Sequence, residues 1–306
     1  MTTLLAGVTA RSSTSAADLD AIDAMTARLP YALHRIDLPW RISSTATHDS
    51  DNIRIWAAAD GTPIAWAILQ YPWHCLDYEI ARGPYREALE EAILTWAADR
   101  LGVEATQRGA DLPFFVSTRS DDSERLAAIR RAGFALADWS YVHMSRSLVQ
   151  PIDNPALPDG FRIRSLRGES EVESYVATHR AAFGSTNMTV DWRQRTLRHR
   201  RYVPDLDLIA EASDGTMAAF CVGWLLVSDA GTVAQVEPLG VLPAFQRMGL
   251  GQAMLAEVFR RAQNLGARLI EVDAESYNSA SRSLYESAGF REIITTPFGS
   301  RVFQPS

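Results

Sequence analysis

The chain has 306 residues, of which 47% are hydrophobic and 22% are charged. This composition excludes a disordered chain, a collagen-like fibre and a disulfide miniprotein, and the length suits two domains of about 150 residues each. The 37 acidic and 30 basic residues give a net charge of −7, which does not favour nucleic acid as a partner. With two cysteines, no basic leader and no long apolar run, the sequence predicts a cytoplasmic protein without a membrane partner.

The first half begins with a hairpin signal. Asp60-Gly61-Thr62 separates two strand-like runs, 53–58 and 64–69. A helix is expected to end at Leu101-Gly102, and a shorter helix is expected before Gly133. Prolines at 151, 155 and 158 then interrupt regular structure and mark a linker.

The second half repeats these signals in the same order. Asp214-Gly215-Thr216 echoes the first hairpin turn, and residues 276–290 lie over residues 120–134 without a gap. Chance similarity of short turn patterns is the alternative to a tandem duplication. We interpret the chain as two copies, a first domain over 1–150 and a second over 158–306.

Within the second copy, the apolar periodicity predicts elements of both kinds. The expected order is a strand at 161–166, a helix over 169–183, a hairpin over 208–227, a strand over 232–241, a helix that follows Pro243, begins within a glycine-bearing segment and runs to Leu265, a strand over 268–274, a helix over 279–287 and a last strand. A helix between consecutive strands favours a crossover and parallel pairing. The expected class is therefore α/β, with mixed, partly parallel twisted sheets flanked by helices.

The loop from Gln246 to Gly251 is a candidate phosphate site. Gly249 and Gly251 allow backbone N–H groups to approach a ligand where a helix begins, and the helix N-terminus favours negative charge. Met254 replaces the third glycine of a dinucleotide fingerprint, and no Gly-Lys-Ser/Thr is present for a P-loop. Two glycines at the start of a helix are otherwise explained by tight packing.

With these motifs, the second half resembles the GCN5-related N-acetyltransferase (GNAT) superfamily. The strand 237–241, the loop 246–251 and Asn278, seven residues before Tyr285, match that family's acetyl-CoA motifs in order. The tandem arrangement is similar to mycothiol synthase-like proteins. The resemblance implies that acetyl-CoA is the cosubstrate and is held by these residues: Leu239, Gly240 and Val241 along the pantetheine arm, Gln246, Arg247, Met248, Gly249, Leu250, Gly251 and Gln252 around the pyrophosphate, and Asn278 near the arm.

Two positions depart from the family pattern or from ordinary strand chemistry. Arg247 stands where the family commonly has glycine, so it either adds charge near the 3′-phosphate or points outward. Pro238 cannot donate to a strand ladder, which suits a place where two parallel strands splay apart around the cofactor, or else an ordinary edge strand.

Acyl transfer to an amine needs a base, an acid and an oxyanion donor. Tyr285 is the candidate acid for the departing thiolate, with core packing as the alternative. Glu237 is the candidate base, acting through water, with a hydrogen-bonded strand carboxylate as the alternative. Gln235 would orient the amine or the water, and the Val241 N–H would be the oxyanion donor. A run of arginines over 193–201 would steer phosphates or an acidic substrate, or else form a solvated helix face.

The first copy lacks the counterparts of this machinery. Alignment of the two long helices places Tyr85 and Glu87 at the positions of Gly249 and Gly251, and Ile129 falls on Tyr285. We therefore expect a degenerate first domain that binds no acetyl-CoA, and no metal site. The predicted activity is direct acetyl transfer from acetyl-CoA to a small-molecule amine by a monomer or homodimer. A non-catalytic acyl-CoA sensor and a transferase with another acyl donor remain alternatives, and the acceptor is open.

Overall fold

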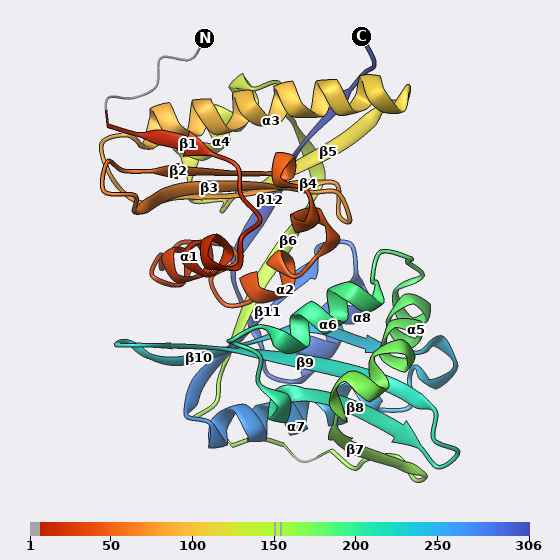
Figure 1. Cartoon of the computed structure of the whole chain (residues 1–306). Helices are drawn as coiled ribbons and strands as arrows, with labels where there is room; N and C mark the ends of the chain where they lie inside the picture. The colour runs from red at the N-terminus through yellow and green to blue at the C-terminus, as the bar shows by residue number, and fades with distance from the viewer. Residues whose placement is uncertain (1–6, 150, 154) are drawn as a thin grey trace. The chain divides into compact units, whose positions relative to one another are not determined.

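The computed structural model describes residues 7–149, 151–153 and 155–306. The chain forms two compact units that are interleaved in sequence. The first contains residues up to Arg35, Ser44–Tyr141 and Ile294–Ser306, and the second contains Ile36–Ser43 and Val142–Ile293. Each unit therefore includes a segment from the opposite half of the sequence, and β6 (Ala135–Ser147) and β12 (Arg291–Phe303) each run from one unit into the other (Figure 1).

The first unit has a mixed sheet with strand order β1-β2-β3-β4-β5-β12. A parallel register joins β4 to β5, whereas β12 pairs antiparallel to β5. Helices α3 and α4 lie over one face and α1 over the other. The elements are β1 (Thr9–Arg11), α1 (Ala16–Ala27), β2 (Ile53–Ala57), β3 (Pro63–Gln70), β4 (Cys75–Ile80), α3 (Arg86–Arg108), β5 (Leu112–Ser117) and α4 (Ser123–Arg131).

The second unit repeats this plan with strand order β6-β11-β10-β9-β8-β7. Here β10 and β11 are the parallel pair, and α7 packs on the face opposite to α5. The elements are α2 (Leu38–Ile42), β7 (Phe161–Ser165), α5 (Val172–Phe183), α6 (Val190–Arg198), β8 (Asp207–Ala212), β9 (Met217–Ser228), β10 (Gly231–Val241), α7 (Leu250–Asn264), β11 (Ala267–Glu275) and α8 (Ser279–Ser287). The expected α/β class with two related copies is confirmed.

The helix α7 begins after a turn that follows β10. Pro243–Phe245 forms one 3-10 turn, and the α-helix starts only at Leu250. The reason is that Arg247 and Gly249 adopt positive φ angles of 62° and 90°, which no α-helix accommodates. The helix therefore begins within the glycine-bearing segment and runs to Leu265 as its C-cap, as expected.

The long helix of the first unit differs from its expectation. α3 continues through Gly102 to Arg108 and ends at Gly109, whose φ of 61° forms the left-handed cap. It has 23 residues against 15 in α7. Their N-terminal ends nevertheless correspond, because Tyr85 is the N-cap of α3 and Gly249 the N-cap of α7.

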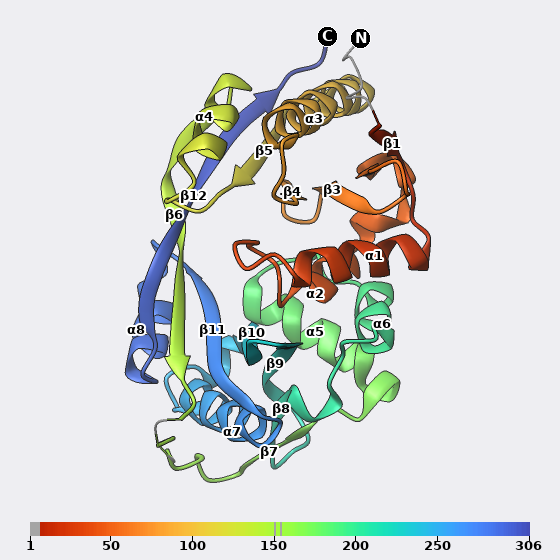
Figure 2. The ribbon, with the colours of Figure 1, turned by 90° about the vertical axis from the view of Figure 1, so that its left-hand side faces the viewer.

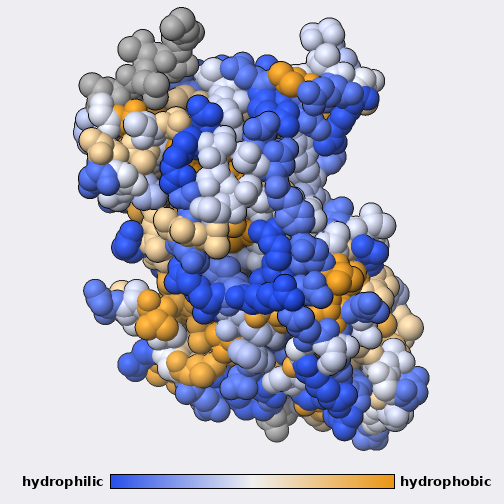
Figure 3. All heavy atoms as spheres, in the orientation of Figure 1, coloured by the Kyte–Doolittle hydropathy of each residue, from blue (hydrophilic) through white to orange (hydrophobic). Residues whose placement is uncertain are grey.

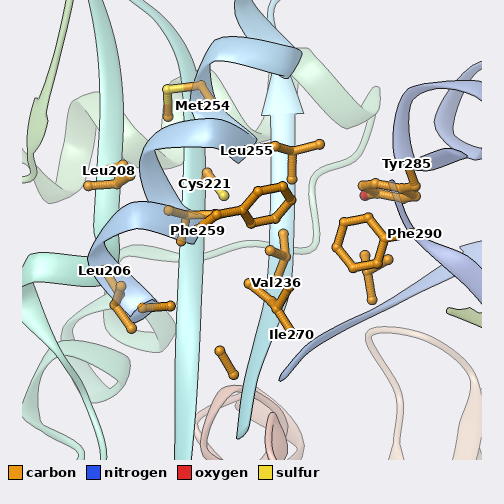
Figure 4. Packing of buried hydrophobic residues seen from close by; sticks show 14 of the residues in the cluster. Leu206, Leu208, Cys221, Val236, Met254, Leu255, Phe259, Ile270, Tyr285 and Phe290 are labelled. Atoms are coloured by element: carbon orange, nitrogen blue, oxygen red, sulfur yellow. The ribbon is translucent and has the colours of Figure 1, made fainter. Parts of the chain in front are cut away.

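Each unit has its own hydrophobic core. Buried side chains from α3, α4 and β2–β5 form the first, and those from α7, α8 and β8–β11 form the second (Figure 4). The face seen in Figure 3 is mainly hydrophilic with smaller apolar patches. No helix in the described part of the chain has the length and apolarity to cross a membrane.

Candidate active site

The two parallel strands of the second unit separate at the level of Glu237. Their described register runs from Thr232–Ala267 to Gln235–Glu271 and ends there. Beyond it β10 stays paired with β9 only, through Leu239, Gly240 and Val241. The sequence interpretation of Pro238 as part of a splayed region fits this geometry, and a row of backbone groups on β10 faces away from β9 without a partner strand.

A bulge marks the point of separation. The β9–β10 register shifts between Val236 and Leu239, and the Glu237–Pro238 peptide bond is cis. The carbonyl oxygen of Glu237 accepts a hydrogen bond of 2.7 Å from the Trp224 indole instead of a ladder bond. Trp224 is fully buried, so it fixes the backbone that carries Glu237.

Gly240 is required by the packing of this strand. A Cβ atom placed on it would lie 2.3 Å from the Cζ atom of Phe220, its cross-strand partner on β9. The Phe220 ring therefore occupies the space of the missing side chain, and β10 remains flat along 239–241. The predicted pantetheine-binding residues thus present their backbone at the open edge.

The loop after β10 forms the start of α7. Gln246 donates its side-chain Nε2 to the Val241 carbonyl at 3.2 Å, which closes the loop onto the strand. Arg247 and Met248 are exposed, and Arg247 adopts the left-handed φ that explains why glycine is common at this family position. Gly249 caps α7 without a side-chain hydrogen bond, and the first turn of the helix contains no acidic residue. A helix N-terminus without a capping side chain or an acidic residue suits a pyrophosphate.

The same loop is held against α8. The side chain of Leu250 is buried, so only its backbone is available to a ligand. A Cβ atom on Gly251 would lie 3.0 Å from a Leu284 methyl group. Gln252 donates to the Ser287 hydroxyl at 3.3 Å. The missing side chain at Gly251 therefore serves close helix packing, the alternative considered from sequence, as well as backbone access.

Asn278 begins α8 as its N-cap. Its side-chain oxygen accepts from the Ser281 N–H at 3.1 Å, and its Nδ2 donates to Glu275 at 3.2 Å. The amide is therefore held between the end of β11 and the start of α8. The 246–252 loop contacts β10 through Gln246 and α8 through Gln252.

Glu237 lies in a strongly acidic surrounding. Burial, followed by the charges of Asp37 and Asp273, raises the pKa of its carboxyl to about 8, while Arg41 acts in the opposite direction. A carboxyl with this pKa accepts a proton near neutral pH much more readily than an exposed glutamate does. This is the electrostatic environment expected of a general base.

Tyr285 is buried at the edge of the core, with its ring 5.7 Å from that of Phe290. In Figure 4 its hydroxyl end points back over the core towards Leu255. Burial, and next the charge of Glu237, raise the pKa of the Tyr285 phenol well above its ordinary value. The hydroxyl therefore stays protonated at physiological pH, and core packing and a role as proton donor are compatible.

Further polar residues at the site were not predicted from sequence. His143 on β6 bonds Asp273 through Nδ1 at 3.0 Å and lies 3.6 Å from Glu271 through Nε2. Gln235, which the sequence did indicate, donates from Nε2 to the other Asp273 oxygen at 3.5 Å. The alternation of Glu271, Asp273 and Glu275 on one strand was a usable signal, because it puts three carboxyls on one face. Among the described residues, no group of His, Cys, Asp or Glu is arranged to hold a metal ion.

The arginine run over 193–201 has mainly structural contacts. Arg193 is completely buried and forms an ion pair with Asp207. Arg195 and Arg201 donate to backbone carbonyls of the segment 36–43. For Arg193, which is fully buried, both the phosphate-steering role and the solvated helix face considered from sequence are wrong.

In the first unit, an arginine fills the corresponding strand gap. The β4–β5 register covers only Cys75–Phe115 and Leu76–Val116. Arg125 from α4 then donates to the Tyr78 carbonyl at 3.4 Å, to Glu79 at 3.5 Å and to Glu90 at 3.1 Å. Its guanidinium also lies 4.1 Å above the Tyr78 ring, and all four side chains are buried.

The correspondence between the two copies is visible in their helix caps. Asp122 accepts from the Arg125 N–H, as Asn278 accepts from the Ser281 N–H, both at 3.1 Å. Arg125 therefore takes the place of Ser281. In addition, Arg86 at the start of α3 forms an ion pair with Asp122, which bridges the two helix N-termini.

Comparisons with known proteins agree with this geometry. A model of the acetyltransferase (GNAT) family matches residues 172–290. A mycothiol acetyltransferase of Geodermatophilus obscurus is 27% identical over 222 residues, which cover 69% of this chain and 68% of that protein. One of Acidothermus cellulolyticus is 32% identical over 186 residues, 54% of this chain and 55% of that protein.

The second unit, over residues 172–290, is similar to the acetyltransferase (GNAT) family. Several of the curated relatives, such as that of Acidothermus, are matched over little more than half of their own length.

Solved structures show the same tandem GNAT fold. A GCN5-related N-acetyltransferase from Sphaerobacter thermophilus has a TM-score of 0.67 at 22% identity and covers 99% of this chain and 98% of its own. A tandem GNAT protein from the clavulanic acid biosynthesis pathway has a TM-score of 0.65 at 12% identity, with 98% and 99% coverage. At these identities the likeness concerns the fold.

Proposed function

We propose that this protein transfers the acetyl group of acetyl-CoA directly to the amine of a small molecule, with its second unit as the catalytic one. The observation that carries the proposal is the unpaired edge of β10, which leads from Glu237 through Gly240 into the uncapped N-terminus of α7. This combination offers backbone partners for an extended amide chain and positive dipole for a pyrophosphate.

Different residues along this edge bind different parts of acetyl-CoA. Leu239, Gly240 and Val241 offer backbone groups to the pantetheine arm, and the 246–252 loop offers N–H groups to the pyrophosphate. Asn278 offers its amide near the arm. When bound, acetyl-CoA supplies the acetyl group as a reactive thioester.

Two side chains carry out the proton transfers, one as the acceptor and one as the donor. An amine arrives as an ammonium and must lose a proton before it attacks, and Glu237 accepts that proton directly or through a water. The thiolate that leaves needs a proton, which the Tyr285 hydroxyl donates. Tyr285 regains a proton from the nitrogen as the amide forms, so one proton in total is released to solvent. The Val241 N–H is the proposed oxyanion donor.

The acceptor amine is to be identified by experiment. The curated relatives are named mycothiol acetyltransferases, so an amine of the mycothiol class is the first acceptor to test, followed by antibiotics, polyamines and peptide N-termini.

The test is a thiol-release assay with this amine panel, combined with calorimetry of acetyl-CoA. Tyr285→Phe is expected to lower turnover by a factor of about 10²–10⁴ and to leave acetyl-CoA affinity unchanged. Binding of acetyl-CoA without turnover of any amine would favour a sensor. Turnover with another acyl-CoA but not with acetyl-CoA would assign a different donor.

A further inference from the structure

A short segment from the N-terminal half of the sequence belongs to the catalytic unit. Residues 36–43, which include α2, separate from the first unit and pack with the second. Figures 1 and 2 show α2 on the side of the sheet that carries α5 and α6. Leu38, Trp40 and Ile42 are buried, so the segment is anchored by apolar side chains as well as by its backbone.

One end of the segment is held next to the bulge. Arg201 donates from Nη2 to the Ile36 carbonyl at 2.8 Å and to the Leu225 carbonyl at 3.2 Å. Leu225 directly follows Trp224 on β9, the residue whose indole bonds the backbone carbonyl at the bulge. The residue after Ile36 in the chain is Asp37, whose side chain is buried.

A second set of contacts links Trp40 of the segment to the aromatic ring over Gly240. Trp192 donates its indole N–H to the Trp40 carbonyl at 3.0 Å, and their rings lie 5.1 Å apart. The Trp40 ring lies 6.0 Å from His179, which stacks on Phe220 at 5.4 Å. Phe220 is the ring that fills the space over Gly240.

These two sets of contacts reach β10 at Glu237, through Trp224, and at Gly240, through Phe220. The charged groups that act on the Glu237 carboxyl come from the segment, as Asp37 and Arg41, and from β11, as Asp273 and Glu275. Besides burial, the charge of Glu237 in turn raises the pKa of Tyr285 on α8. The segment thus contributes both a negative and a positive group to the surroundings of the base.

We propose that Asp37 is a positioning residue that holds the ammonium of the acceptor beside Glu237, with Arg41 as its opposing charge. The proposal rests on the proposed function of Glu237. It assigns acceptor selection in the catalytic unit to residues encoded in the N-terminal half, on a segment that no acetyl-CoA motif contains. A buried carboxylate next to a base stabilises a cation at that place and opposes deprotonation of the neighbouring carboxyl.

The experiment compares Asp37→Asn and Arg41→Gln in steady-state kinetics from about pH 6 to pH 10. Asp37→Asn is expected to raise the KM for the amine about tenfold, and to move the acid limb of kcat/KM down by about one pH unit, because a neighbouring negative charge is lost. Arg41→Gln is expected to move the same limb up. Glu169→Gln, which removes an exposed carboxylate paired with Arg198, should change neither.

A structural defect would lower the activity of Asp37→Asn and Arg41→Gln, but it would not move the acid limb of kcat/KM in opposite directions in these two variants. Asp37→Glu keeps the charge and is expected to retain the wild-type limb, with the unfolding temperature of each variant as the folding control. Unchanged KM and limb in Asp37→Asn, or shifts of the same sign in both variants, would overturn the inference. If the wild-type protein binds acetyl-CoA but acetylates no amine, the proposed function itself fails and this inference falls with it.

Discussion

The raised pKa of Glu237 leads to a quantitative pH profile. The carboxyl is protonated below about pH 8, so the base is active only above it, and at pH 6 about one molecule in 100 carries the carboxylate. We therefore expect kcat/KM to fall about tenfold per pH unit below pH 8, and to lie about 100-fold under its plateau at pH 6. Tyr285 stays protonated over this range, since its pKa is raised, and adds no second limb.

The assay measures thiol release at subsaturating amine, with an acceptor whose own ammonium pKa lies above about 10, so that the amine arrives as an ammonium and its ionisation lies outside the range from about pH 6 to pH 8. Glu237→Gln should lower kcat/KM by a factor of about 10²–10⁴ at high pH and remove the limb. Glu286→Gln, an exposed neighbour of Tyr285, should keep the wild-type profile. A flat wild-type rate between pH 6 and pH 8, or an unchanged limb in Glu237→Gln, would refute the assignment of the base.

Two predictions concern stability. Gly240→Ala forces a Cβ atom into the Phe220 ring and should destabilise the second unit by about 1–3 kcal/mol. Gly102→Ala lies at an open helix position and should stabilise the protein by about 0.5–1 kcal/mol. Denaturant unfolding measures both free energies, and equal effects would contradict the packing argument. Arg125→Leu leaves buried carboxylates without their cation and should cost about 3–5 kcal/mol, against less than about 0.5 kcal/mol for the exposed Arg130→Leu. A small loss in Arg125→Leu would show that the gap in the first unit is not filled by a required charge.

The local signals of this sequence predict much of the fold. The Asp-Gly-Thr turns, the alternation of the strands and the repeat over 120–134 and 276–290 identify the elements because each depends on neighbours in the chain. The start of α7 within the glycine-bearing segment is confirmed, whereas helical periodicity does not reveal that Arg247 takes a left-handed φ. The predicted end of α3 is wrong because Gly102 has no capping conformation and lies inside the helix.

The site was predictable where its residues follow one another along the chain. Glu237, the 246–251 loop and Asn278 lie on consecutive elements of one copy, so their motif order indicated them. His143 and Asp37 come from elements distant in sequence, and their places depend on how β6 and the segment 36–43 pack in the second unit. No period or turn signal carries that information.

The central claim is that the loop before α7 and the open edge of β10 hold acetyl-CoA. Isothermal titration of the full chain with acetyl-CoA tests it most directly. We expect one equivalent per chain, since Arg125 fills the corresponding gap of the first unit, and an affinity at least about tenfold lower in Gly249→Ala, because its φ of 90° disfavours a side chain. Gly231→Ala places the same strain in a hairpin outside the site and should leave the affinity unchanged. Absence of binding heat, or two equivalents per chain, would contradict the account.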